Sequence, residues 1–279
     1  MANSTKNLHH DGAPIISILM KPSKIKWITG VGVFVGLWTG SALIASDNPP
    51  SGAPTAGQIF ETMRENYATL KSYSDSGQIC TALDGGTNVT DFTTRLARPG
   101  FYRIQWNQPD SSDPGTHAAW SLGVSSYIQM GTGIQRQPDR DVSLANLTTS
   151  SGGEVATVPT LFFNPQTTDW ADKVIGLERL ADDKIGKIDC YQITGQLETG
   201  ETKTFWIGKD DFFIYQIRTE ADPGVLRAAW TSTTGHPVPG PDVHSFSSIE
   251  TFTNIAVNVK LYRPDFVPSC PMFDEQINR

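Results

Sequence analysis

Residues 98–106 read Arg98-Pro99-Gly100-Phe101-Tyr102-Arg103-Ile104-Gln105-Trp106. Proline fixes one backbone torsion and glycine accepts positive φ, so the first three residues favour a tight turn. The residues after the turn alternate, and Tyr102, Ile104 and Trp106 would share one face of a strand. We therefore expect a sharp turn that leads into an aromatic-rich strand.

Short alternating runs separated by turn residues continue on both sides of this stretch. Strands are predicted at residues 76–83, 88–97, 101–107, 117–121, 125–130, 172–180, 187–197, 203–208, 212–220, 226–231 and 245–258. The alternation lapses between residues 141 and 163, where one or two short helices are expected. Consecutive antiparallel strands with short turns predict an α+β domain with a large curved sheet, its helices confined to one end and the middle of the chain.

An amphipathic helix is predicted just before the first strand. Thr55 and Gln58 have the spacing of a capping box, in which each side chain satisfies a backbone N–H group of the first turn. Apolar residues follow at helical spacing, and they are Ile59, Phe60, Met63, Tyr67 and Leu70. This pattern predicts a helix of about four turns with one buried face.

The N-terminal part of the chain has the character of a membrane segment. Residues 27–45 are uncharged and almost wholly apolar or small, and they are long enough to cross a bilayer. Lysines precede this segment and the next basic residue is Arg64, so the positive-inside rule predicts a cytoplasmic tail at 1–26. Residues 46–54 would be a linker. Residues 55–279 would form a single domain in the periplasm, on the far side of the bacterial inner membrane from the tail. A cleaved signal peptide, which would leave a soluble periplasmic protein, and a buried helix are the alternatives for 27–45.

Charge and cysteine content limit the possible functions. The chain has 22 basic and 29 acidic residues; removing the four basic and one acidic residue of 1–46 leaves 18 and 28, about −10, for the rest. Such an acidic body is a poor candidate for binding nucleic acid or an anionic membrane. Cys80, Cys190 and Cys270 allow at most one internal disulfide, whose pair the sequence does not identify, and buried thiols are equally consistent.

The sequence contains no pattern that indicates catalysis or a cofactor. The five histidines are scattered, and the cysteines lack zinc-site spacing. There is no nucleophile elbow, P-loop or dinucleotide fingerprint. We therefore predict no catalytic residues, no metal, no cofactor and no enzyme activity.

Several blocks, in the same order, resemble the periplasmic lipoprotein carrier family (LolA/LolB-like). They are the opening helix with residues 67–73, the turn and strand at 98–110, the apolar strand and charged turn at 204–212, and the closing segments 252–255 and 262–268. The resemblance implies an unclosed, strongly bent antiparallel half-barrel with a helix lid over an apolar cavity, in which lipid or acylated lipoprotein binds. In the family the arginine of the turn holds the lid closed, a role that Arg98 would have here.

The expected cavity combines the apolar faces of the predicted helices and of the aromatic strand. Its lining residues would be Ile59, Phe60, Met63, Tyr67, Leu70, Phe101, Ile104, Trp106, Leu161 and Phe162. The alternative hypothesis is a membrane-anchored module that senses the state of the envelope or binds a membrane protein on the same fold. A carrier needs a continuous apolar cavity under the helices, whereas an interaction module can fill that space with its own side chains. The family's lipidated cysteine is absent, and residues 225–243 have no counterpart in it.

Overall fold

The computed structural model describes residues 52–84, 86–108, 115–131, 133–150, 155–163, 170–198, 200–222, 224 and 245–268. The chain divides into the units 1–47 and 48–279, and every described residue belongs to the second unit. The predicted tail and membrane segment, most of the linker, the strand at 226–231 and Cys270 therefore lie outside the described residues. Among the residues that are described, no helix is both long and apolar enough to span a membrane.

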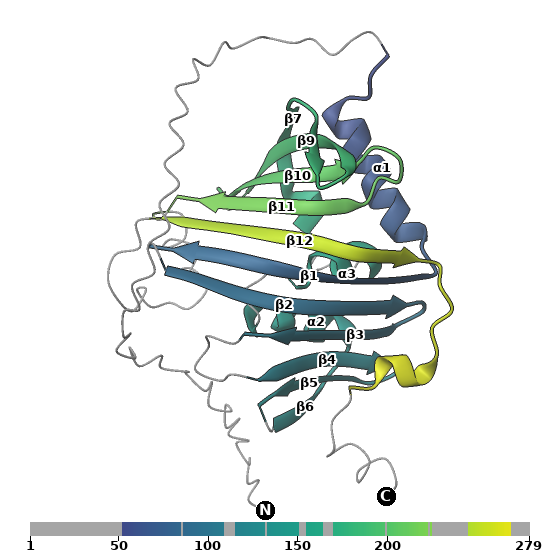
Figure 1. Ribbon diagram of the computed structural model, residues 1–279. Helices are drawn as coiled ribbons and strands as arrows, with labels where there is room; N and C mark the ends of the chain where they lie inside the picture. Colours follow the sequence, from purple (N-terminus) through teal and green to yellow (C-terminus); the bar gives the residue numbers. More distant parts are fainter. Residues whose placement is uncertain are drawn as a thin grey trace, which may run out of the picture. The chain divides into compact units, whose positions relative to one another are not determined.

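Twelve strands form one antiparallel sheet (Figure 1). They are β1 (Ser72–Leu83), β2 (Gly86–Ala97), β3 (Phe101–Asn107), β4 (Thr116–Leu122), β5 (Ser126–Met130), β6 (Gly133–Gln137), β7 (Val174–Arg179), β8 (Asp183–Ile185), β9 (Ile188–Leu197), β10 (Thr202–Gly208), β11 (Ile214–Ala221) and β12 (Phe246–Val257). Their order is β6-β5-β4-β3-β2-β1-β12-β11-β10-β9-β7, and β8 pairs with β9. The last strand, β12, thus lies between β1 and β11 and joins the two halves of the sheet.

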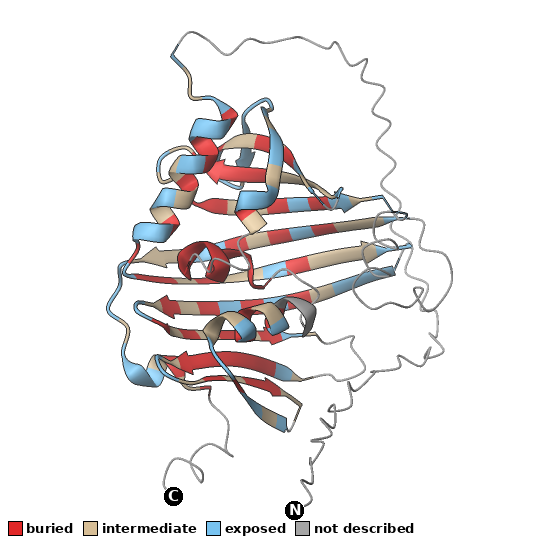
Figure 2. Ribbon diagram, turned by 180° about the vertical axis from the view of Figure 1, so that it is seen from behind, coloured by how far each residue is buried: buried red, intermediate tan, exposed pale blue. Residues whose placement is uncertain are grey.

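The helices cover one face of this sheet, as Figure 2 shows from behind. They are α1 (Ala56–Thr69), α2 (Arg140–Ser150), α3 (Thr157–Phe163) and the 3-10 turn η1 (Trp170–Lys173). A second 3-10 turn, η2 (Arg263–Phe266), packs against β3 and β4. We call the face under the helices the inner face and the opposite one the outer face.

The local structure follows the sequence patterns closely. The predicted capping box is present, because Thr55 Oγ1 accepts from the N–H of Gln58 at 3.2 Å and Gln58 Oε1 accepts from the N–H of Thr55 at 2.9 Å. In β3, Tyr102, Ile104 and Trp106 are buried, whereas the residues between them are partly exposed. The short strands β6 and β8 were not predicted.

The unclosed antiparallel α+β architecture is confirmed, since β6 and β7 end the strand order without pairing with each other. The expected strong bend is wrong, because the sheet is not strongly curled (Figure 1). The described hydrophobic core lies between Ala56 and Phe266 in the sequence. Residues 48–279 therefore contain every described core residue, and we expect them to fold as a unit without the N-terminal segment.

Candidate functional site

The apolar face of α1 packs directly on the inner face of the sheet. Ile59, Phe60 and Met63 are almost completely buried. The ring of Phe60 lies 5.5 Å from that of Phe205 in β10 and 6.3 Å from that of Trp170 in η1, centroid to centroid. The predicted lining residues of α1 thus face the sheet, where its own aromatic side chains meet them.

Tyr67 connects the end of α1 to the sheet by both packing and hydrogen bonding. Its ring lies 5.6 Å from Tyr73 in β1 and 5.4 Å from Phe213. Its hydroxyl oxygen accepts from the N–H of Ile214 at 3.1 Å. Complete burial raises the pKa of Tyr67, so this hydroxyl stays protonated.

A buried carboxyl group lies beside this pair of tyrosines. Asp75 of β1 points to the inner face and accepts a hydrogen bond from the hydroxyl of Tyr73 at 2.8 Å. Burial raises the pKa of Asp75 to about 7, although hydrogen bonds from Tyr73 and Thr94 act in the opposite direction. Asp75 was not predicted as a site residue, although it alternates with Tyr73 and Ile79 on the apolar side of the strand.

The C-terminal end of helix α3 contacts the aromatic strand β3. Leu161 and Phe162 are buried, and Phe163 packs edge-on against Tyr102 at 6.1 Å. Ile104 and Trp106 are buried on the same face. The structure therefore brings these predicted lining residues of α3 and β3 to one interface.

Phe101 requires a correction, because its ring belongs to the outer face. It lies 5.6 Å from the ring of Phe266 in η2. The reason is the strand period: Phe101 is odd-numbered in a strand whose inward residues are Tyr102, Ile104 and Trp106. The residues that can face the helices therefore exclude Phe101.

Arg98 joins the β2–β3 turn to the C-terminal ends of two helices. Its Nε donates to the carbonyl of Leu70 at 2.9 Å, and Nη2 donates to the carbonyls of Ala68 and Phe162, each at 2.5 Å. The guanidinium also lies 4.7 Å from the ring centroid of Phe162. Since carbonyl groups at helix C-termini carry partial negative charge, this is a favourable place for a cation.

A second arginine also contacts the end of α3, next to Arg98. Arg140, at the start of α2, has its guanidinium carbon 4.7 Å from the ring centroid of Phe163. Burial lowers the pKa of Arg98, and the neighbouring Arg140 lowers it further. Two arginine side chains therefore flank adjacent phenylalanines of α3.

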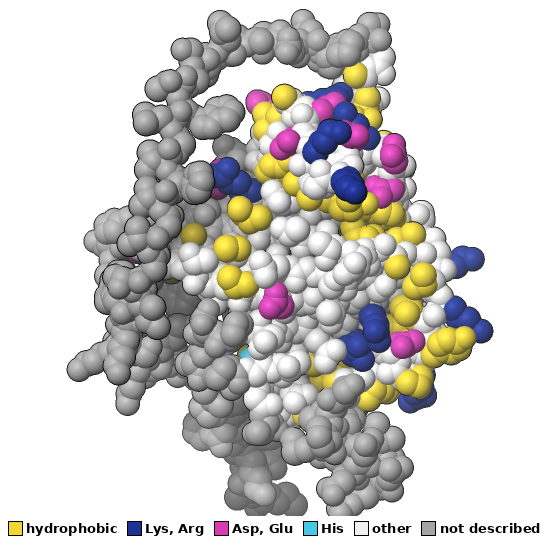
Figure 3. Space-filling model, in the orientation of Figure 1, with side chains coloured by type: hydrophobic (Ala, Val, Ile, Leu, Met, Phe, Trp, Pro, Cys, Tyr) yellow, Lys and Arg dark blue, Asp and Glu magenta, His cyan; other side chains and the backbone are white. Residues whose placement is uncertain are grey.

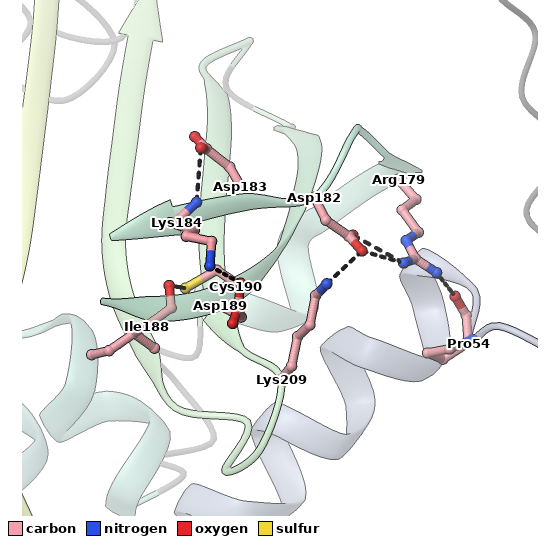
Figure 4. A network of polar contacts seen from close by, with 9 residues as sticks. All are labelled: Pro54, Arg179, Asp182, Asp183, Lys184, Ile188, Asp189, Cys190 and Lys209. Atoms are coloured by element: carbon pink, nitrogen blue, oxygen red, sulfur yellow. Dashed lines mark hydrogen bonds and ion pairs between the residues drawn. The ribbon is translucent and has the colours of Figure 1, made fainter. Parts of the chain in front are cut away.

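A separate polar network fastens the start of α1 (Figure 4). Arg179 of β7 donates through Nη1 to the carbonyl of Pro54 at 2.9 Å, and its Nη2 pairs with Asp182 at 2.9 Å. Lys209 pairs with the same carboxylate at 2.7 Å. The residue at which the chain enters α1 is thereby fixed to the edge of the sheet.

The inner face is polar at the end of the strands that lies away from Arg98. Thr90, Thr219, Ser248 and Glu250 are buried there. Lys203 Nζ donates to Thr219 Oγ1 at 2.8 Å. The surface under the helices thus changes from aromatic near the Arg98 turn to polar at the other end.

Metal-binding and redox groups do not gather at this site. Within the described ranges, no three His, Cys, Asp or Glu side chains are placed to hold a metal ion. Cys80 and Cys190 are free thiols. Of the histidines, His117 of β4 is buried with its ring 5.5 Å from that of Trp106.

Comparisons with known proteins add a likeness of fold. No family model and no curated protein matches the chain. It is similar to a LolA superfamily protein from Nitrosomonas europaea, with 13% identity, a TM-score of 0.35 and coverage of 77% of this chain and 99% of that chain. It is similar to LprF from Mycobacterium bovis, with 10% identity, a TM-score of 0.43 and coverage of 76% of this chain and 97% of that chain. It is also similar to a chain of the MucA/MucB complex from Pseudomonas aeruginosa, with 10% identity, a TM-score of 0.41 and coverage of 77% of this chain and 61% of that chain.

The resemblance to the lipoprotein carriers is confirmed as a structural likeness at low sequence identity. Such a likeness concerns the arrangement of strands and helices. The function has to be argued from the residues described above.

Proposed function

We propose that the domain binds the acyl chains of a lipid or lipoprotein between the helices and the inner face of the sheet, without catalysing a reaction. The observation that supports this most directly is Arg98. A single side chain on the sheet holds carbonyl groups of both α1 and α3, and the surface between them is apolar. Breaking these few bonds would expose aromatic and aliphatic side chains to a ligand.

The energetics suit an acyl chain. Burying one methylene group contributes about 0.8 kcal/mol, so a chain of sixteen carbons gains on the order of 12 kcal/mol. Charge-assisted hydrogen bonds contribute roughly 1.5–3 kcal/mol each, so those of Arg98 can close the helix layer without preventing ligand entry. In this proposal the closed state keeps Phe162 and its neighbours from water while no ligand is bound.

The site residues of the proposal are those that the structure brings to the inner face. They are Ile59, Phe60, Met63, Tyr67, Leu70, Ile104, Trp106, Leu161 and Phe162, with Arg98 as the latch. The open sheet would form one wall of the binding site and the helices the other. The polar end of the inner face, with Thr219 and Ser248, suits an amphiphile whose two ends differ in polarity.

The predicted N-terminal segment completes the proposal. Retained as an anchor, residues 27–45 would hold the domain on the periplasmic side of a bacterial inner membrane; cleaved, they would leave a soluble periplasmic carrier. Either arrangement places the site beside membranes that contain acylated molecules.

The first test is native mass spectrometry of residues 48–279, purified from the periplasm without detergent. An acyl-bearing adduct at one copy per domain is expected, and lipid extraction would identify it. A mass that stays ligand-free after incubation with phospholipids and acylated peptides would contradict the proposal.

The second test concerns the latch. Replacing Arg98 by leucine removes all three hydrogen bonds and favours the open state, so a fluorescent fatty acid should bind at least about tenfold more tightly. Arg98→Lys, which retains the charge, should have a smaller effect. Arg218→Leu, on the outer face of β11, is the matched control. Unchanged uptake and release in Arg98→Leu would show that Arg98 is not a latch.

A protein-interaction module on the same fold is the second candidate. The observation that favours it is the tight packing of the inner face, where Phe60, Tyr67 and Phe162 leave almost no exposed surface. If the domain never takes up lipid, this function would replace the carrier function.

A further inference from the structure

Cations from distant parts of the sequence gather at one rim of the sheet, around the Arg98 turn. We call this group the basic rim, and it consists of Lys71, Arg95, Arg103, Arg136, Lys260 and Arg263. They come from the end of α1, the strands β2, β3 and β6, and the segment after β12. The carboxylate of Asp265 lies among these cations and pairs with Arg95 at 3.4 Å. Two more exposed carboxylates lie on the same segments, Asp91 farther along β2 and Asp139 just after β6. The rim therefore has the opposite sign to a chain of net charge −7.

Backbone contacts show that the first part of the rim is continuous. The carbonyl of Lys71 accepts from the N–H of Arg98 at 3.0 Å, and the N–H of Lys71 donates to Asn258 Oδ1 at 2.9 Å. Ser72 Oγ donates to the carbonyl of Val259 at 2.6 Å. The latch turn and the segment after β12 thus lie next to each other.

Other contacts extend the rim across β3 and β4. The N–H groups of Arg103 Nη1 donate to the carbonyl of Val267 at 3.0 Å, which ties the segment of η2 to β3. Gly100 lies against Gly123, because a Cβ atom at Gly100 would be 3.6 Å from the Gly123 carbonyl oxygen. Arg136 Nη2 donates to Ser125 Oγ at 3.1 Å in the β4–β5 turn. Six strand spacings of about 4.8 Å separate β6 from β12, so the rim is about 29 Å wide.

Large apolar side chains project from the same rim. Val124, in the β4–β5 turn, is 93% exposed, Tyr262 is 57% exposed and Val259 is 40% exposed. Lys260 Nζ lies 5.0 Å from the ring centroid of Tyr262. Figure 3 shows hydrophobic and basic side chains side by side over this part of the surface.

We propose that the basic rim docks on the surface of an anionic lipid bilayer. Lysine and arginine near such a surface are attracted by its negative potential, while exposed aliphatic and aromatic side chains enter the interface. A valine that is almost fully exposed at the tip of a turn suits a fluid apolar layer. For this reason we favour a bilayer over an acidic protein as the partner.

This proposal revises one expectation from the sequence. The acidic composition of the body argues against binding to an anionic membrane, but it is an average over the whole surface. The rim cations are separated by up to about 190 positions in the chain, so no basic run marks them. The fold gathers these cations at one rim of the sheet. Docking through the rim would make the β2–β3 turn with Arg98 face the membrane.

The test is sedimentation of residues 48–279 with lipid vesicles. Binding is expected to vesicles that contain phosphatidylglycerol, to weaken with rising salt, and to be far weaker with pure phosphatidylcholine. The variant Lys71→Gln/Lys260→Gln/Arg263→Gln removes three exposed charges. Each charge is worth about fivefold in binding, so the loss should be about a hundredfold.

A matched control removes three exposed lysines near the opposite edge of the sheet, in the variant Lys173→Gln/Lys184→Gln/Lys187→Gln. This control has the same net charge as the rim variant and should bind vesicles like the unmodified domain. Val124→Ser should weaken binding several-fold without changing its salt dependence. Absence of vesicle binding, or an equal loss in rim and control variants, would overturn the proposal.

Vesicle docking is independent of acyl binding under the helices. The sedimentation assay measures the first, and native mass spectrometry measures the second. A failure of one proposal is therefore distinguishable from a failure of the other.

Discussion

Asp75 should make the stability of the domain depend on pH in a direction opposite to that of an ordinary surface carboxylate. The side chain is 6% exposed and lies beside Tyr73, Tyr67 and Thr94 under the helix layer. Burial disfavours its charged form, which raises its pKa from the ordinary value of 3.8 to about 7. The unfolded chain loses this proton near the ordinary value, whereas the folded domain keeps it.

The magnitude follows from the difference in pKa. Below pH 3.8 the group is protonated in both states and its contribution to stability is complete. As pH rises from there to about 7, the unfolded state releases the proton first, so the free energy of unfolding falls. At about 1.4 kcal/mol per unit, the total loss is on the order of 4 kcal/mol.

Urea unfolding of residues 48–279 between pH 4 and pH 8 measures this effect. Asp75→Asn keeps an oxygen that accepts from Tyr73 but does not titrate, so the variant should lose the decline and exceed the unmodified domain in stability above pH 7. Asp91→Asn, an exposed residue of the outer face, is the control and should keep the decline. Parallel pH profiles for Asp75→Asn and the unmodified domain would refute the assignment of a raised pKa to Asp75.

Three further predictions concern stability and reactivity. Gly77→Ala should destabilise the domain by several kcal/mol in urea unfolding, because its Cβ would lie 2.3 Å from both the ring of Phe92 and a carbonyl oxygen of β12; a loss below 1 kcal/mol would show that β1 can shift. Thr55→Ala removes the cap of α1 and should lower the free energy of unfolding by about 1 kcal/mol, whereas Thr55→Ser should restore it. Cys190, which is buried with its pKa raised to about 11, should react with a thiol reagent far more slowly than Cys80 in the folded domain, and equal rates would contradict its burial.

Local patterns in the sequence predicted most of the fold because they depend on neighbours in the chain. The capping box at Thr55, the alternation in β3 and the lapse between residues 141 and 163 each correspond to an element with bounds close to those expected. The short strands β6 and β8 escaped prediction because five and three residues carry too little alternation to register. Phe101 was misplaced although its odd position in the strand already indicated the outer face.

The site was predictable only in part, for a different physical reason. Arg98 was singled out through the resemblance of its turn to that of the lipoprotein carriers, and its carbonyl partners lie at the ends of α1 and α3. Asp75 and the basic rim depend on which strands become neighbours, and β12 sits between β1 and β11 although about 160 residues separate it from β1. A single sequence contains no signal for such long-range pairing, so a buried carboxyl group and gathered cations become visible only in the fold.

The distribution of contacts also decides which helix can move in the proposed opening. Helix α1 is fixed at its start by Arg179 through the carbonyl of Pro54, and in its middle by the ion pair of Arg64 with Asp172. Near its end, Asn66 donates to the carbonyl of Asp211 at 2.9 Å, and Tyr67 accepts from β11.

Helix α3 is bound differently. It is short, and all of its residues are apolar or threonine. Besides packing, two hydrogen bonds join it to its surroundings: Arg98 donates to the carbonyl of Phe162, and Trp170 donates to the carbonyl of Thr157. Within the described residues, the directional contacts of α1 are spread along its length, whereas α3 has these two. Opening should therefore separate α3 from α1 and leave α1 on the sheet. Arg98 binds both helices at the point of separation, which is where a latch has to act.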